Sequence, residues 1–214
     1  MQRLVFLFVK IVKRVKRACY QPVDWLGSFV IFYVNNVQFS SFSNQGWPRV
    51  NVSREGGLTI GPGFRSNNRE MANPIGRFHP CSLIVSGNGK LSIGSNVGMS
   101  SSAIVCHREV VIGDNVNLGG GTVIYDTDFH SIKRVDRIDP IADRANTKTA
   151  PVIIEKDVFI GGHTTILKGV TIGEGSVIGA CSVVTRNIPA GELWAGNPAK
   201  FLRSLSEGSH KGYY

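Results

Sequence analysis

Residues 152–184 read VIIEKDVFIGGHTTILKGVTIGEGSVIGACSVV, and this stretch decides the fold. An aliphatic residue recurs in it every six positions, at Ile154, Ile160, Ile166, Ile172, Ile178 and Val184. A six-residue period fits neither the turn of a helix nor the alternation of an isolated strand. It is typical of a β-solenoid, in which each unit is a short strand followed by a tight corner.

The same period continues upstream, at Ile93, Met99, Val105, Ile112, Leu118 and Ile124. The step from Val105 to Ile112 is seven residues, so we expect one residue to bulge out of the coil there. Residues 126–150 are rich in charge and lack an aliphatic register, which predicts a loop extruded from the wall. One hexapeptide cannot bury its own aliphatic side chain, so the stability of such a fold comes from stacked coils.

The composition predicts one domain. The 214 residues include 25 glycines and are 42% hydrophobic, which suits one long core. We expect an N-terminal helical region at 1–40, a β-helix domain at 41–203 and a C-terminal tail at 204–214. The four cysteines show no metal-ligand spacing and no secretory signal is evident, so a cytoplasmic setting is expected.

The net charge of +9 is concentrated near the N-terminus, because residues 1–20 contain six basic residues and no acid. At helical spacing Leu4, Phe8, Ile11, Val12 and Val15 share one face, opposite the basic residues. Such a helix is too short and too charged to span a bilayer. It fits either a peripheral anchor on the anionic inner face of the cell membrane or a cap on the solenoid end, continued by residues 25–34. Liposome flotation after removal of residues 1–20 distinguishes the two. Nucleic acid is not an expected partner, since no recognition motif accompanies the charge.

Three motifs carry a family resemblance: IGDNV at 112–116, GVTIGEGSVIGA at 169–180 and AGNPAK at 195–200. They resemble the hexapeptide-repeat acyltransferases, and more narrowly the maltose, galactoside, nodulation-factor, capsule and colanic-acid O-acetyltransferases. The similarity covers residues 93–203. It implies a left-handed parallel β-helix, a homotrimer with active sites between neighbouring subunits, and acetyl-coenzyme A as the donor. No metal is predicted.

The segment YDTDFHS, 125–131, is where the chemistry is expected. The resemblance implies that His130, at the start of the extruded loop, is the general base. An unperturbed imidazole, with a pKa of ~6.5, accepts a hydroxyl proton at neutral pH and returns it to the leaving thiolate. Asp128 is expected to orient His130 or bind the acceptor, because residues two apart on a strand share a face, and Asp126 is the second candidate. The alternative is that both aspartates cap the turn into the loop.

The same family resemblance implies which residues form the donor and acceptor sites. Residues of the coil wall would flank the pantetheine arm and approach the nucleotide, and two basic residues would lie near its phosphates: Gly162, Ala180, Thr185, Arg186, Lys200 and Arg203. Ser100 is the candidate for binding the acceptor, in place of the asparagine that sugar acetyltransferases commonly have. Polar residues of the first coils either line an acceptor pocket or close the coil: Asn44, Arg65, Asn67, Asn68 and His79.

These observations predict an acetyl-coenzyme A-dependent O-acetyltransferase that acts on a sugar hydroxyl in surface polysaccharide biosynthesis. An amino-sugar N-acetyltransferase and a serine O-acetyltransferase need the same base and donor site, so both stay open. A zinc-dependent carbonic anhydrase of this fold needs three histidines with two at close spacing, and His107, His130 and His163 do not match that pattern. A non-catalytic scaffold would need neither His130 nor the AGNPAK ending.

Overall fold

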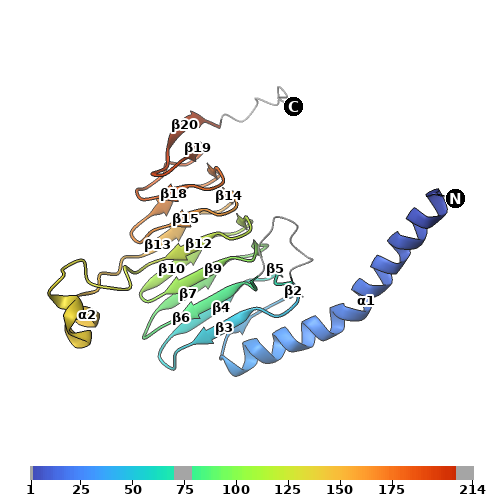
Figure 1. The fold of residues 1–214 in the computed structure, drawn as a ribbon, viewed down its shortest axis with the longest axis horizontal. Coiled ribbons are helices and arrows are strands. Elements are labelled where there is room, and N and C mark those ends of the chain that lie inside the picture. Colours follow the sequence, from blue (N-terminus) through green and yellow to red (C-terminus); the bar gives the residue numbers. More distant parts are fainter. Residues whose placement is uncertain (1, 70–78, 206–214) are drawn as a thin grey trace.

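Coils of three hexapeptide units stack into a three-sided column in the computed structural model, which describes residues 2–69 and 79–205 (Figure 1). Each coil contributes one short strand to each of three sheets, so neighbouring strands of a sheet come from successive coils. An interior strand therefore pairs with the coil before it and the coil after it, which leaves no free edge along the stack. The predicted fold class is confirmed: a left-handed parallel β-helix with an N-terminal helix and an extruded loop.

We call the three sheets A, B and C. Sheet A contains β1 (Gln38–Phe39), β4 (Gly57–Ile60), β7 (Lys90–Ile93), β10 (Glu109–Ile112), β13 (Val152–Ile154) and β16 (Thr171–Ile172). Sheet B contains β2 (Phe42–Gln45), β5 (Phe64–Asn67), β8 (Gly98–Ser100), β11 (Asn117–Leu118), β14 (Phe159–Ile160), β17 (Val177–Ile178), β19 (Glu192–Ala195) and β20 (Lys200–Ser204). Sheet C contains β3 (Arg49–Val52), β6 (Ser82–Val85), β9 (Ala103–Cys106), β12 (Val123–Tyr125), β15 (Thr165–Ile166) and β18 (Val183–Val184). Neighbouring strands pair in parallel, except that β19 and β20 are antiparallel.

The aliphatic anchors of the repeat form the core, as the fully buried Ile160 and Ile166 illustrate. Two positions before an anchor, a hydroxyl often replaces the aliphatic side chain, and it bonds to a backbone carbonyl at a corner. The Gly179 carbonyl accepts from Thr164 Oγ1 at 3.2 Å and from Ser182 Oγ at 2.6 Å. These bonds satisfy buried polar groups at the corners, so the column stays tightly packed where the chain turns.

The register around β9 differs from the prediction. Val105 was expected to face the core, but Ile104 and Cys106 are fully buried and Val105 is partly exposed. Ile104 pairs with Ile124, only five residues after Met99, because the chain turns early through Ser101 at a φ of 44°. The extra length then falls in the next corner, between β9 and β10.

Helix α1 (Gln2–Val34) has two parts: its C-terminal part caps the first coil of the column, and its N-terminal part extends beyond the column. Phe32 is fully buried, and its ring lies 5.1 Å from that of Phe42 and 5.4 Å from that of Phe39. The C-terminal part of the helix therefore closes the first coil. The N-terminal part runs away from the column (Figure 1).

The predicted apolar and basic faces of residues 1–20 depend mostly on side chains outside the described part of the structure, those of 11–18 among them. No helix in the described residues is both long enough and apolar enough to cross a bilayer. The bounds 1–40, 41–203 and 204–214 stay a prediction, and residues 206–214 of the tail lie outside the described residues.

The extruded loop leaves the column between β12 and β13, where the chain passes from sheet C to sheet A. We call this corner the A–C edge. The loop contains a 3-10 turn, η2 (Asp136–Ile138), and a short helix, α2 (Pro140–Asn146), which the sequence did not predict. The Asp139 side chain caps α2 by accepting from the Ile141 amide at 3.0 Å. The loop is thus an ordered projection of the wall (Figure 1).

Candidate functional site

His130 lines a cavity of about 650 Å³ at the base of the extruded loop. We call this cavity the loop pocket. Its walls come from the loop, from α2 and from the neighbouring A–C edge: Ser86, Gly87, His107, Phe129, His130, Pro140, Asp143, Arg144, Thr147 and Thr149. The backbone turns sharply beside the histidine, because Phe129 has a φ of 63°. The side chain of His130 is 70% exposed, so substrates in the pocket can reach it.

Asp143, on α2, is the carboxylate partner of His130. Its Oδ2 lies 2.6 Å from His130 Nδ1, and its Oδ1 accepts from the Ser131 amide, also at 2.6 Å. The bond from His130, together with that from Ser131, holds the pKa of Asp143 below its usual value. A carboxylate on Nδ1 orients the ring and leaves Nε2 as the nitrogen that can accept a proton.

Asp126 does not reach the loop pocket. It is fully buried, and its carboxylate accepts from the backbone amides of His107, Arg108 and Glu109 at 2.7 to 2.8 Å. The carboxylate therefore holds the lengthened corner between β9 and β10. This geometry favours the turn-capping alternative over acceptor binding.

The sequence predicted that Asp128 orients His130, but the structure pairs Asp128 with a different residue. Its Oδ1 pairs with Lys168 Nζ at 2.6 Å, and Lys168 lies on the next coil along the A–C edge. The prediction applied strand alternation to residues 128 and 130, but β12 ends at Tyr125, so the two side chains do not share a strand face. The ion pair instead ties the start of the loop to the wall.

Two cysteines, Cys81 and Cys106, lie in the core. Burial raises the pKa of Cys106 to about 12, with a further contribution from the charge of Asp126. Burial also raises the pKa of Cys81 to about 11. Both thiols stay protonated at neutral pH, so neither is suited to act as a nucleophile.

The predicted donor residues lie on two different edges. Gly162 and Ala180 lie at the B–C edge, where sheet B passes into sheet C, on successive coils. The two coils approach closely beside them, since a Cβ at the neighbouring Gly161 would lie 2.5 Å from the Ala180 nitrogen. Thr185 and Arg186 are exposed on the A–C edge after β18.

Lys200 and Arg203 lie on β20, the last strand of sheet B, and both are exposed. They therefore share a sheet with Ser100, which lies on β8. None of the six donor candidates lines the loop pocket that contains His130.

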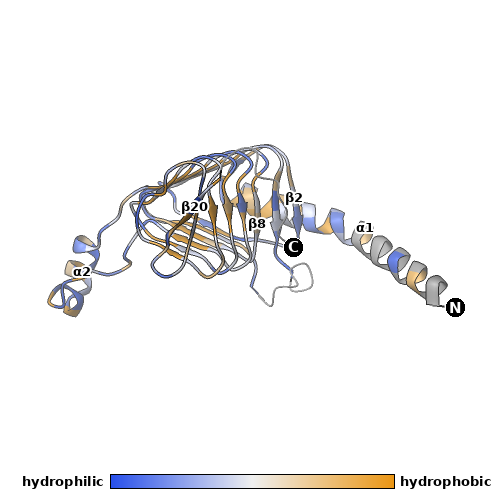
Figure 2. Ribbon diagram, turned by 90° about the horizontal axis from the view of Figure 1, so that it is seen from above, coloured by the Kyte–Doolittle hydropathy of each residue, from blue (hydrophilic) through white to orange (hydrophobic). Residues whose placement is uncertain are grey.

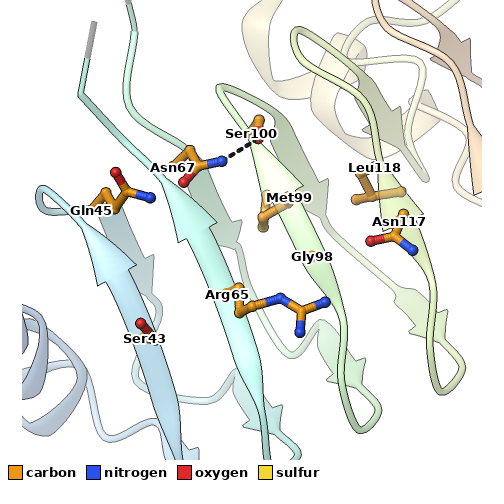
Figure 3. Close-up of a pocket in the computed structure, with 9 residues that line it drawn as sticks. All are labelled: Ser43, Gln45, Arg65, Asn67, Gly98, Met99, Ser100, Asn117 and Leu118. Atoms are coloured by element: carbon orange, nitrogen blue, oxygen red, sulfur yellow. Dashed lines mark hydrogen bonds between the residues drawn. The ribbon is translucent and has the colours of Figure 1, made fainter. Parts of the chain in front are cut away.

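Ser100 lines a second cavity, of about 300 Å³, on the outer face of sheet B (Figure 3). We call it the sheet-B pocket. Its lining comes from four neighbouring strands: Ser43, Gln45, Arg65, Asn67, Gly98, Met99, Ser100, Asn117 and Leu118. Ser100 Oγ accepts from Asn67 Nδ2 at 2.9 Å.

The polar residues of the first coils divide between the two roles considered for them. Arg65 and Asn67 line the sheet-B pocket. Asn44 is buried and accepts from Ser66 at 2.8 Å, while Asn68 Oδ1 accepts from the Cys81 amide at 2.9 Å, so these two close the coil. His79 is exposed and lines neither pocket.

The loop pocket and the sheet-B pocket share no residue and lie on different sides of the column. Viewed along the stack, α2 projects from one side of the cross-section, and β2 and β8 of sheet B lie toward the other (Figure 2). The A–C edge is the corner opposite sheet B in a three-sided column. A small ligand therefore cannot contact both pockets of one chain.

Sequence reasoning missed Asp143 and His107. Asp143 lies 13 residues after His130 in a segment without a repeat register, and only the fold of α2 brings it back to the histidine. His107 was considered only as a zinc ligand, yet it lines the loop pocket with its ring centroid 6.1 Å from that of Phe129. In the described residues, no three His, Cys, Asp or Glu side chains gather to form a metal site.

Comparison with known proteins gives a family match in the most regular coils. Residues 151–186 match the family model described as bacterial transferase hexapeptide, six repeats. The chain is also 38% identical, over 95 residues, to 2,3,4,5-tetrahydropyridine-2,6-dicarboxylate N-acetyltransferase from Staphylococcus aureus. That alignment covers 44% of this chain and 33% of the relative, so the chain spans about a third of the length of the curated relatives it matches.

Solved structures extend the likeness to most of the column. A variant of AntD, an N-acyltransferase from Bacillus cereus in complex with dTDP and coenzyme A, is 25% identical, with a TM-score of 0.58. The match covers 79% of this chain and 84% of AntD. Another AntD complex gives a TM-score of 0.64 at 22% identity over 82% of this chain and 87% of that one, which shows the shared fold. The chain thus carries the hexapeptide repeat of the bacterial transferases on the fold of the hexapeptide-repeat acyltransferases.

Proposed function

We propose that the protein is an acetyl-coenzyme A-dependent O-acetyltransferase that acts on a sugar hydroxyl, in the biosynthesis of a surface polysaccharide. The observation that carries this proposal is the His130–Asp143 pair, 2.6 Å apart, at the open loop pocket. An oriented imidazole beside an ionised carboxylate is the arrangement that general-base catalysis requires.

His130 Nε2 accepts the proton of the acceptor hydroxyl as the hydroxyl oxygen attacks the thioester carbonyl. The bond between carbonyl carbon and sulfur then breaks, and the imidazolium returns the proton to the thiolate of coenzyme A. Asp143 stabilises the imidazolium between these two transfers, because its lowered pKa keeps it ionised. Transfer is direct, so no covalent intermediate with the protein forms.

We assign binding of the acetyl-coenzyme A donor to the residues that the family resemblance implies. Gly162 and Ala180 provide a narrow backbone path at the B–C edge. Thr185 and Arg186 lie on the A–C edge, so they would contact the nucleotide of the same donor only from a neighbouring copy. Lys200 and Arg203 supply positive charge for the phosphates of coenzyme A. The AntD neighbour, whose structure contains coenzyme A, supports this choice of donor.

The separation of the two pockets supports a homotrimer with shared sites. The loop pocket lies at the edge opposite sheet B, so the base of one chain can serve a ligand on sheet B only if that sheet belongs to another chain. Cyclic assembly brings unlike surfaces of neighbouring copies together, as such a site needs. Contact of residues 1–20 with an anionic membrane is retained as part of the proposal, with the flotation assay as its test.

The alternative is transfer to an amine, as in an amino-sugar N-acetyltransferase. It is favoured by the names of the relatives, since the Staphylococcus aureus enzyme and AntD both transfer to nitrogen. A serine O-acetyltransferase would use the same base and is distinguished by the acceptor alone.

The test is thiol release from acetyl-coenzyme A across sugars, amino sugars, serine and lipid-linked glycans, with His130→Ala in parallel. We expect release that needs a sugar hydroxyl and falls by about 10²- to 10⁴-fold in His130→Ala. His79→Ala is the matched control, because His79 is exposed and lines neither pocket. Near-normal turnover in His130→Ala would sink the mechanism. Release that needs an amine would replace the O-acetyl assignment.

A further inference from the structure

The outer face of sheet B changes character along the stack. One row of outward positions runs through Ser43, Arg65, Gly98 and Asn117, which are paired strand to strand. The next partner in this row is Phe159, with 50% of its surface exposed. The first coils therefore present a polar surface, and the sheet-B pocket lies within it.

Gly98 creates the hollow. A Cβ at this position would lie 2.9 Å from Asn117 Oδ1 and 3.7 Å from Arg65 Nη2. Because glycine has no side chain, the Arg65 guanidinium extends across β8 toward Asn117 (Figure 3). Any larger residue would fill the space between the two, so glycine keeps this row open.

The lining offers neutral hydrogen-bonding groups on one side and a cation on the other. In a second row, Gln45, Asn67 and Ser100 are paired across β2, β5 and β8. The Asn67–Ser100 bond holds two of these groups in place (Figure 3). Met99 and Leu118 alternate with these outward positions and bury their side chains in the core, so they contribute strand backbone to the floor. Amides and hydroxyls around a shallow floor suit a saccharide better than an apolar ligand.

Arg65 is the cation of the pocket, and no acidic residue lines it. In the part of the chain that the structure describes, Arg65 forms no ion pair. Its bond to the carbonyl oxygen of Asn96 is long, at 3.5 Å. The guanidinium is therefore left to bind a ligand, and its planar fork matches a carboxylate or a phosphate.

We propose that the sheet-B pocket binds an anionic saccharide, with Arg65 on its carboxylate or phosphate group and with Asn67 and Ser100 on its hydroxyls. This inference rests on the proposed function, since the saccharide is the acetyl acceptor, and His130 of a neighbouring copy serves it. It narrows the acceptor from sugars in general to acidic sugars.

The test is binding, measured by NMR titration of the full chain with D-glucuronate, D-glucose 6-phosphate and D-glucose. We expect at least one acid to bind more tightly than glucose, with an affinity that falls as salt is raised. Arg65→Gln should weaken binding of that acid by about 10- to 100-fold, while Arg65→Lys, which keeps the charge but loses the fork, should lie between. The acid that binds identifies the anionic group.

Arg54→Gln is the matched control, because Arg54 is an exposed arginine at the turn after β3 and lines neither pocket. Equal binding of glucose and both acids, or equal loss in Arg54→Gln and Arg65→Gln, overturns the inference. Saccharide binding does not require acetyl transfer, so the NMR titration is independent of the thiol-release assay. An acid that binds through Arg65 without thiol release would contradict the proposed function and leave the anion site standing.

Discussion

The loop pocket and the sheet-B pocket are built in opposite ways on the same column. The loop pocket interrupts the repeat, and its central pair, His130 and Asp143, is assembled by an inserted segment with its own short helix. The sheet-B pocket stays within the repeat, and its residues are regular outward positions of paired strands. In the proposed function, the insertion supplies the reactive group and substitution along a row of strand positions supplies the recognition surface.

This difference predicts different kinetic effects. Changes in the loop pocket should lower kcat, since the proposed mechanism has its side chains act on the reacting atoms. Changes on sheet B should raise KM, because in our proposal its side chains bind parts of the acceptor that do not react.

The largest effect after loss of His130 itself is expected for Asp143→Asn. The substitution removes the charge-assisted hydrogen bond between the Asp143 carboxylate and His130, worth about 1.5–3 kcal/mol, so kcat should fall by about 10- to 100-fold. KM for the acceptor should stay within a few-fold. Steady-state thiol release at saturating donor measures both values. A change confined to KM would remove Asp143 from the reaction.

The pKa of Asp143 gives a second readout of the same pair. The bond to His130 lowers this pKa, so the carboxylate stays ionised at neutral pH, and the bond is lost only as the pH falls through the lowered pKa. In His130→Ala the pKa of Asp143 should rise toward its ordinary value, as followed by carbon-13 NMR of the carboxyl group. An unchanged pKa would mean that the pair does not form in solution.

The smallest effect is expected for Asn67→Ala, which removes one neutral hydrogen bond in the sheet-B pocket. KM for an acidic acceptor should rise by about 5-fold, the equivalent of about 1 kcal/mol, while kcat stays unchanged. Asn51→Ala, at an exposed position of β3 on sheet C, is the control. A fall in kcat alone would place Asn67 with the chemistry and erase the contrast between the pockets.

The regular coils were predictable from the sequence because each buried anchor repeats at a fixed spacing. Ile154, Ile160 and Ile166 needed no tertiary information. The register failed at Val105, where a short corner and a long corner compensate and leave the overall spacing almost intact. A sequence period reflects the combined length of two successive corners, but it does not show how many residues belong to each corner.

The site was predictable only in part. His130 was proposed from the family resemblance, which places a histidine at the start of the loop, whereas its partner was assigned to Asp128 by strand alternation that does not extend beyond β12. Asp143 depends on the path of the loop, for which the sequence carries no register. The sheet-B pocket depends on pairings between positions 33 residues apart, such as Asn67 and Ser100, across a coil of irregular length.

The central claim is that His130 of one chain acts on an acceptor held by sheet B of another, and mixed oligomers test it directly. His130→Ala and Arg65→Gln chains would be co-expressed with different tags, and oligomers carrying both tags assayed at low concentration of an acidic acceptor. In a mixed trimer, one interface joins an intact base to an intact sheet-B pocket, so turnover should recover to about one third of the wild-type value. Turnover no higher than that of the two parent variants would contradict the account.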